Sequence, residues 1–339
     1  MKTFSGVMMA AAIAVAGFAG AAGFASAAQA ADHVKVSYPN LNGSYIYFFT
    51  AIDKGYYKAE NLDLEVVETG GGPATAALVS GDLQFSTSGS SAISAIIKGA
   101  KLKVLLVGED RPDWQVWSTK PEIKTFDDLK GQQIGVVSRG DTGEIGIRYY
   151  LLKRGLPSDF VAFTPMGSSL GTRMAMVKSG ALPAALLHPG DVEILKSAGG
   201  LDKGKMLIDL RQEVRSTFNG LATSDDLIKK NPDLVERFVR ATRKGMIFAR
   251  NNREESIQRF AGYMKAKPEE MAGEYDLLRT LMAVDGTIAP DVQQNEVKLR
   301  SAMMDMPADK LMAPSGVFDF SFAQKVNAQL ATQGWKPNP

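Results

Sequence analysis

Glycine and serine residues that could bind an anion gather in short loops of the N-terminal third of this sequence. Residues 70–73 read Gly-Gly-Gly-Pro, and residues 86–91 read Ser-Thr-Ser-Gly-Ser-Ser. Proline is favoured at the first position of a helix, so the amides before Pro73 can face a ligand. Backbone N–H groups and hydroxyls at a helix start attract oxyanions, each helix end contributing about 0.3–1 kcal/mol. The two loops together predict a site for a small polar or anionic molecule.

Other segments could complete this site. Residues 40–45, Asn-Leu-Asn-Gly-Ser-Tyr, either bind a ligand or form an ordinary turn. In residues 138–143, Ser-Arg-Gly-Asp-Thr-Gly, Arg139 could hold a carboxylate or sulfonate through two parallel hydrogen bonds. Asp141 could bind an amine, although a helix cap is the better interpretation. The candidate ligand-binding residues are Asn40, Asn42, Ser44, Tyr45, Gly71, Gly72, Ser88, Ser90, Ser91, Trp114, Arg139, Asp141, Thr142, His188 and Asn219.

The aromatic candidates have ordinary alternatives. Trp114 and Trp117 could sandwich a flat ligand, or they could pack in a core or hinge. His188 ends an apolar segment, where a single histidine is often a boundary residue with its own hydrogen bonds.

Motifs for catalysis and metal binding are incomplete in this chain. Residues 167–171 match the G-x-S-x-G pattern of a nucleophilic serine, whose acid and histidine follow in that order. No Asp or Glu lies between Ser169 and His188, the last histidine. Residues 70–75 lack the third glycine of a dinucleotide-binding loop. With two histidines and no cysteine, we expect no catalytic residue, no metal site and no cofactor.

The loops follow segments that alternate between strand and helix patterns. Between residues 51 and 107 the sequence predicts strands at Leu62–Val67, at Phe85 and at Val104–Val107, with helices between them. Such alternation is typical of an open, mostly parallel α/β sheet, in which ligands bind where the strands end.

The same pattern occurs twice, which predicts two lobes. A first lobe would comprise residues 31–113 and 218–339, and a second lobe residues 114–217. The C-terminal part is mostly helical and starts with an Asn-Pro-Asp cap at residues 231–233. The strands expected beyond those above are His33–Tyr38, Gln115–Thr119, Gln133–Val137, Phe160–Thr164, Ala184–Leu187, Met206–Leu210 and Phe218–Thr223, and the expected helices of the second lobe are Thr142–Arg154 and Thr172–Lys178.

The N-terminus has the pattern of an export signal. Lys2 precedes an apolar, alanine-rich run from Val7 to Phe24, and residues 28–30, Ala-Gln-Ala, supply a cleavage site. We therefore expect residues 1–30 to be a signal peptide that is removed, rather than a membrane anchor. The absence of cysteine excludes disulfides and a lipid anchor on cysteine, so a bacterial periplasm is expected. The net charge of +2 gives no indication of nucleic-acid binding.

Several phrases of the sequence together resemble one known family. They are residues 55–58 followed by 61–66, then residues 78–85, 127–131 and 179–185. In this order they are similar to the nitrate/sulfonate/taurine-type (NMT1/THI5-like) solute-binding proteins, the receptors of ABC importers. The resemblance extends over most of the chain that follows the signal peptide.

The resemblance implies a two-lobed periplasmic binding protein of type II, also called a Venus-flytrap fold. It also implies that the end of the strand before His188 lines the cleft, and that the partners are an ABC permease and its ATPase in the inner membrane. We expect a monomer that closes on a small solute. An organic anion, either a sulfonate or a carboxylate and possibly aromatic, is favoured over an aminopyrimidine, and nitrate ranks lower.

Two other functions remain open at this point. One is a thiamine-pyrimidine binder or a pyrimidine-synthase-like enzyme. The enzyme of this fold carries a cysteine-rich motif, which this chain lacks. The other is the ligand-binding input of a sensory system, which would use the same pocket with a different partner.

Overall fold

A computed structural model describes residues 30–167 and 169–337 of this chain. The expected signal peptide, apart from Ala30, lies outside the described residues. Within the described part, none of the helices combines the length and the apolar character needed to cross a membrane. Residues 31–339 form one unit, which is described here by itself.

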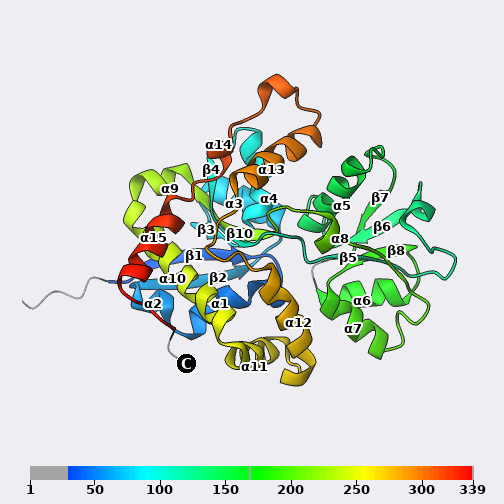
Figure 1. Cartoon of the computed structure of the whole chain (residues 1–339), viewed down its shortest axis with the longest axis horizontal. Helices are drawn as coiled ribbons and strands as arrows, with labels where there is room; N and C mark the ends of the chain where they lie inside the picture. The colour runs from blue at the N-terminus through cyan, green and yellow to red at the C-terminus, as the bar shows by residue number, and fades with distance from the viewer. Residues whose placement is uncertain (1–29, 168, 338–339) are drawn as a thin grey trace, which may run out of the picture. The chain divides into compact units, whose positions relative to one another are not determined.

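Two five-stranded sheets organise this unit (Figure 1). The first sheet has the order β2-β1-β3-β10-β4, and the second has the order β7-β6-β8-β5-β9. The strands of the first are β1 (Asp32–Tyr38), β2 (Leu62–Glu68), β3 (Phe85–Ser86), β4 (Leu102–Glu109) and β10 (Asn219–Ser224). Those of the second are β5 (Gln115–Ser118), β6 (Gln133–Val136), β7 (Ala162–Pro165), β8 (Ala184–Leu187) and β9 (Met206–Asp209). The first lobe is built on the first sheet and the second lobe on the second.

Four of the five strands in each sheet run in the same direction, as expected, and one strand in each runs the opposite way. β1 runs parallel to β2 and β3, and β6 runs parallel to β7 and β8. β10 and β5 run antiparallel to both of their neighbours. A parallel neighbour needs a crossover connection, usually a helix, within the same sheet. β5 and β10 instead follow the segments that pass from one sheet to the other, so the βαβ rule that guided the expectation does not apply to them.

Most helices of the two lobes follow a strand of the same lobe. In the first lobe they are η1 (Gly43–Tyr45), α1 (Ile46–Asp53), α2 (Tyr56–Ala59), α3 (Gly71–Ser80) and α4 (Gly89–Ile97). In the second they are η2 (Phe126–Leu129), α5 (Thr142–Lys153), α6 (Leu170–Lys178), α7 (Pro189–Ser197) and α8 (Leu210–Glu213). The C-terminal helices are α9 (Asp225–Lys230), α10 (Pro232–Asn251), α11 (Arg253–Met264), α12 (Pro268–Leu281), α13 (Pro290–Ala302), η3 (Ala308–Lys310), α14 (Pro314–Val317) and α15 (Ser321–Thr332).

The expected elements are present with small shifts of their ends. The strand expected at Phe160–Thr164 is β7, which begins two residues later. The helix expected at Thr172 begins at Leu170, because Ser169 accepts a hydrogen bond from the amide of Thr172 (3.2 Å) and caps it.

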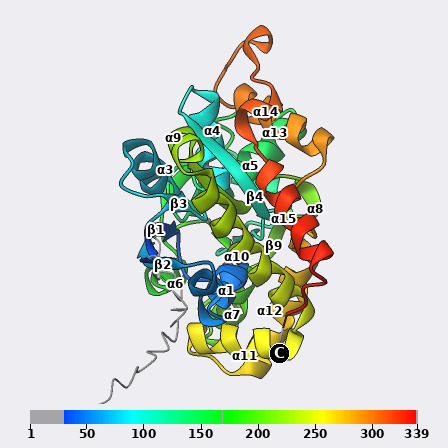
Figure 2. The same ribbon diagram turned by 90° about the vertical axis from the view of Figure 1, so that its left-hand side faces the viewer.

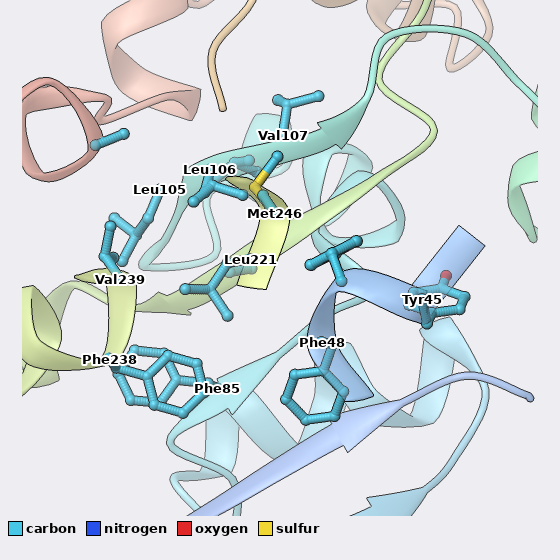
Figure 3. Close-up of a cluster of buried hydrophobic side chains, with 14 of the residues drawn as sticks. Tyr45, Phe48, Phe85, Leu105, Leu106, Val107, Leu221, Phe238, Val239 and Met246 are labelled. Carbon is cyan, nitrogen blue, oxygen red and sulfur yellow. The ribbon is translucent and has the colours of Figure 1, made fainter. Parts of the chain in front are cut away.

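The core of the first lobe lies between its sheet and helix α10. Phe85 of β3 stacks on Phe238 of α10 with ring centroids 3.9 Å apart, and Leu105, Leu106 and Leu221 belong to the same buried cluster (Figure 3). α10 packs against α1 and α15, and Figure 2 shows α15 alongside it. Asn231 caps α10 as expected, accepting from the amide of Leu234 (3.1 Å). This packing fixes the strand ends from which the site is built.

Candidate ligand-binding site

Residues of both lobes line a narrow cavity of about 40 Å³. The lining residues are Pro39, Asn40, Asn42, Tyr45, Gly70, Gly71, Ser88, Ser91, Trp114, Val137, Ser138, Asp141, Thr142, His188 and Phe218. Most of them follow the carboxyl ends of β1, β2, β3, β6 and β8, which are parallel within each sheet. Open α/β sheets bind ligands at this edge. A cavity of this size holds a few water molecules, so a larger solute requires the lobes to separate first.

Helix starts form much of the cavity wall. Five of the lining residues are N-caps: Asn42 of η1, Gly70 of α3, Ser88 of α4, Asp141 of α5 and His188 of α7. The first N–H groups of a helix have no partner within it, and the helix dipole makes this end positive. The wall therefore has the character of an anion-binding surface.

Two of these helix starts are occupied by their own caps. Asn42 Oδ1 accepts from the amide of Ser44 (2.9 Å). Asp141 accepts from the amides of Glu144 and Ser138 (both 2.7 Å), so it caps α5 as expected from the sequence. Burial raises the pKa of Asp141 to about 6, although these amide hydrogen bonds oppose the shift.

Helices α3 and α4 begin without a capping hydrogen bond from a side chain. Their first turns touch, because a Cβ atom on Gly71 would overlap the side chain of Ser91. The two starts thus offer one continuous group of backbone N–H donors on the first lobe.

Three buried polar atoms of the lining residues have no hydrogen-bond partner within the described part of the chain. They are Asn40 Nδ2, Ser88 Oγ and His188 Nε2. Buried polar groups are nearly always paired in folded proteins, so such atoms need a water or a ligand. The amide and the hydroxyl can both donate to an anion.

An aromatic group forms the opposite wall. The ring of His188 stacks on Trp114, and Phe218 meets both edge-on with ring centroids 6.3 Å away. His188 Nδ1 donates to the carbonyl oxygen of Asp113 (2.8 Å), which leaves Nε2 as an acceptor in the neutral ring. Trp114 Nε1 donates to Thr142 Oγ1 (3.3 Å) and links this wall to α5.

Most of the candidate residues come together in the cavity wall. The candidates that line it are Asn40, Asn42, Tyr45, Gly71, Ser88, Ser91, Trp114, Asp141, Thr142 and His188. The candidates that do not are Ser44, Gly72, Ser90, Arg139 and Asn219.

Two of these excluded candidates have partners elsewhere. Arg139 is half-exposed, pairs with Glu144 (Nε–Oε2 3.2 Å) and donates to the carbonyl of Phe163 (3.0 Å). Ser90 Oγ accepts from Arg300 of α13 (3.3 Å). No Lys or Arg side chain lines the cavity as described.

The lining residues that sequence reasoning had not selected are Pro39, Gly70, Val137, Ser138 and Phe218. Gly70 and Ser138 belong to the loops already singled out, and the structure brings those loops together around the cavity. The local sequence around Phe218 does not indicate a site residue. Its position depends on how the chain passes from the second sheet back to the first. Within the described residues, no cluster of three or more His, Asp or Glu side chains could hold a metal ion.

Comparisons with known proteins identify the family and the fold. A family model described as NMT1/THI5 like matches residues 42–256. The riboflavin-binding protein RibY of Chloroflexus aurantiacus is 25% identical over 244 residues, which cover 69% of this chain and 66% of the relative. The chain thus spans slightly less than two thirds of the length of that relative.

Solved structures share the fold at low sequence identity. The periplasmic aliphatic sulphonate binding protein SsuA from Escherichia coli matches with a TM-score of 0.66 and 17% identity, covering 85% of this chain and 92% of that one. The desulfurization enzyme DSZB matches with a TM-score of 0.60 and 15% identity, covering 88% of this chain and 99% of that one. The expected two-lobed α/β fold of periplasmic binding proteins is therefore confirmed.

Proposed function

Since the chain belongs to the NMT1/THI5-like family, we propose that it is the periplasmic solute-binding component of an ABC importer. It holds a small organic anion, a sulfonate or a carboxylate, between its two lobes and delivers it to a permease. The expected signal peptide supports export to the periplasm, and the similarity to SsuA, an aliphatic sulphonate binding protein, supports the ligand class.

The observation that carries the proposal is the group of unpaired donors on one side of the cavity. The uncapped starts of α3 and α4, Asn40 Nδ2 and Ser88 Oγ all belong to the first lobe. Together they can surround the oxygens of a sulfonate or carboxylate without any cationic side chain. The remainder of the solute then packs against Trp114 and Phe218 once the lobes close.

A thermal-melt screen of residues 31–339 against sulfonates, carboxylates, nitrate, aminopyrimidines and riboflavin tests the proposal. A ligand at one hundred times its dissociation constant adds about 2.7 kcal/mol to the free energy of unfolding. That is expected to raise the melting temperature by roughly 4–8 °C in a protein of this size. A rise in melting temperature with sulfonates or carboxylates alone supports an anionic solute. The proposal is contradicted if none of these compounds raises the melting temperature.

A flat, uncharged heteroaromatic solute is the second candidate. The stack of His188 on Trp114 offers an aromatic surface, and the Asp141 carboxylate can accept from ring N–H or amino groups. The name of the relative RibY points to the same ligand class for that protein. A melting shift with riboflavin or an aminopyrimidine, and none with the anions, would select this candidate.

We propose binding rather than catalysis for this chain, although DSZB shows that the fold also serves an enzyme. No side chain of the cavity wall is a plausible activated nucleophile, because Ser88 Oγ lacks a partner base. A sensory partner in place of a permease remains compatible with the same cavity.

A further inference from the structure

Helix α12, which carries Glu274, contacts both η1 of the first lobe and α7 of the second, and Figure 1 shows α12 on the side of the first lobe that faces α7. The Oε1 atom of Glu274 is 3.1 Å from the position that a Cβ atom would take on Gly43 of η1. On the other side, a Cβ atom on Gly190 of α7 would overlap Oε2 and lie 3.0 Å from Cδ. The carboxyl group therefore fits between two glycines, one from each lobe.

Both glycines belong to the segments that form the cavity wall. Gly43 directly follows Asn42, and Gly190 comes two residues after His188, and both of these neighbours line the cavity. The side chain of His188, the N-cap residue of α7, makes no capping hydrogen bond to that helix. Glu274 thus packs behind both walls and against the first turn of α7.

Two carboxylates act on Glu274, and Lys265, Glu193 and Glu270 line the same surface pocket as Glu274. Burial is the largest cause that raises the pKa of Glu274, which becomes about 8. The carboxylates of Asp113, in the segment that joins the two sheets, and of Asp191 of α7 raise it further. Glu109 at the end of β4 is fully buried beside Asp113, and its pKa is also raised by burial.

The neighbouring arginines are engaged elsewhere. Arg173 pairs with Asp191 (3.0 Å), and Arg211 pairs with Asp209 while lying 3.9 Å from Asp113. His188 is hydrogen-bonded to the backbone of Asp113. Among the described residues, no ion pair forms with Glu274 itself.

We propose that Glu274 is a positioning residue that holds the two lobes together in its neutral form, so that closure of the cavity takes up a proton. The proposal concerns the movement of the lobes and does not depend on which solute binds, so it can fail while the proposed function stands.

The direction of the pH dependence follows from linkage. When the lobes separate, the partly buried Glu274 becomes more exposed to water, and its pKa returns toward its ordinary value of 4.5. The contribution of neutral Glu274 to the stability of the closed arrangement is then fully present below about pH 4.5. It is lost as the pH rises to about 8. Within this window, the ratio of closed to open molecules falls by up to about tenfold per pH unit, the limit for one proton.

Spin labels can measure this opening without any solute. The sequence has no cysteine, so Val79→Cys on α3 and Met206→Cys on β9, both at exposed positions, allow one label on each lobe. Dipolar distances measured from pH 5 to pH 9 should show a closed population that declines up to about pH 8. In E274Q, whose amide resembles the neutral acid, the closed population should persist at every pH. Glu269→Gln, an exposed change on the same helix, should behave as the parent.

A steric variant tests the contact independently of charge. Gly190→Ala places a methyl group against Glu274 and should favour the open population even at pH 5, whereas Gly262→Ala on α11, which has free space around it, should not. The proposal is overturned if the parent shows the same distances at all pH values. It is also overturned if E274Q follows the same pH dependence as the parent, or if Gly190→Ala stays closed.

Discussion

The imidazole ring of His188 stacks on the indole of Trp114 with ring centroids 3.6 Å apart and planes inclined by 29°. Trp114 lies in the segment that enters the second sheet, and His188 is the N-cap residue of α7. The stack therefore joins the crossing segment to a helix start, and it presents an aromatic wall to the cavity opposite the donors of the first lobe.

Replacement of Trp114 tests this wall. Trp114→Phe reduces the area of the aromatic surface and removes the hydrogen bond to Thr142. The affinity for an aromatic solute should therefore fall about tenfold. Titration calorimetry with an aromatic solute identified by the melting screen measures this. The matched control is Trp117→Phe, since Trp117 is buried in the same lobe and does not line the cavity. Equal losses in both variants would show a general effect on packing instead.

Two neighbouring glycines at the start of α3 allow a matched pair of variants that tests the donor group. Gly71→Ala should lower affinity at least tenfold, because the new methyl group would collide with Ser91 and separate the two helix starts. Gly72→Ala, one residue further along the same helix, meets nothing within 4 Å and should leave affinity within about twofold. Affinities of the two variants for an anionic solute, with their melting temperatures as controls, decide the point. Unchanged affinity in Gly71→Ala would remove this donor group from the site.

Arg139 is expected to be dispensable for binding. Sequence reasoning made it a partner for an anion, but its guanidinium group is directed to Glu144 and to the carbonyl of Phe163. Arg139→Ala should therefore change affinity by less than about twofold and stability by at most about 1 kcal/mol, as is usual for a half-exposed ion pair. A large loss of affinity would mean that Arg139 turns toward the solute when the lobes close.

The pH dependence of the free energy of unfolding should reveal the raised pKa of Asp141. Burial raises its pKa to about 6 in the folded protein, from an ordinary value of 3.8. The protonated form is thus favoured by folding, and this contribution is present below about pH 4 and is lost as the pH rises through about 6. Thermal melts of Asp141→Asn from pH 4 to pH 7 should decline less over this window than those of the parent, by about 2 kcal/mol in free energy at most. Asp159→Asn, at an exposed position, should follow the parent curve.

The sequence predicted the fold and the loops that line the cavity, because both depend on local patterns. Strands such as Ala184–Leu187 are short apolar runs, and the glycine and serine loops that follow strands can only be helix starts or turns. The antiparallel course of β5 and β10 was not predictable in this way, since it depends on where the chain leaves each sheet.

The assignments of individual side chains were harder for the same reason. Ser90 has the sequence context of a ligand residue, yet it is paired with Arg300, which is 210 positions away. Arg139 pairs with Glu144, which is near in sequence, but nothing local shows that the pair points away from the cavity. Glu274 and Arg300 lie beyond residues 42–256, the part that matches the family model, so neither could be expected from the shared sequence pattern.

Backbone peptide groups form much of one wall of the cavity, and this affects how the specificity of the proposed site can change. Backbone N–H donors at the starts of α3 and α4 persist under most substitutions, because they belong to every residue except proline. The side chains around them, such as Trp114 and Asn40, are free to vary around this constant wall. In the proposed receptor, a new solute preference can therefore arise by exchange of one or two of these side chains, while the backbone donors proposed to hold a polar group remain.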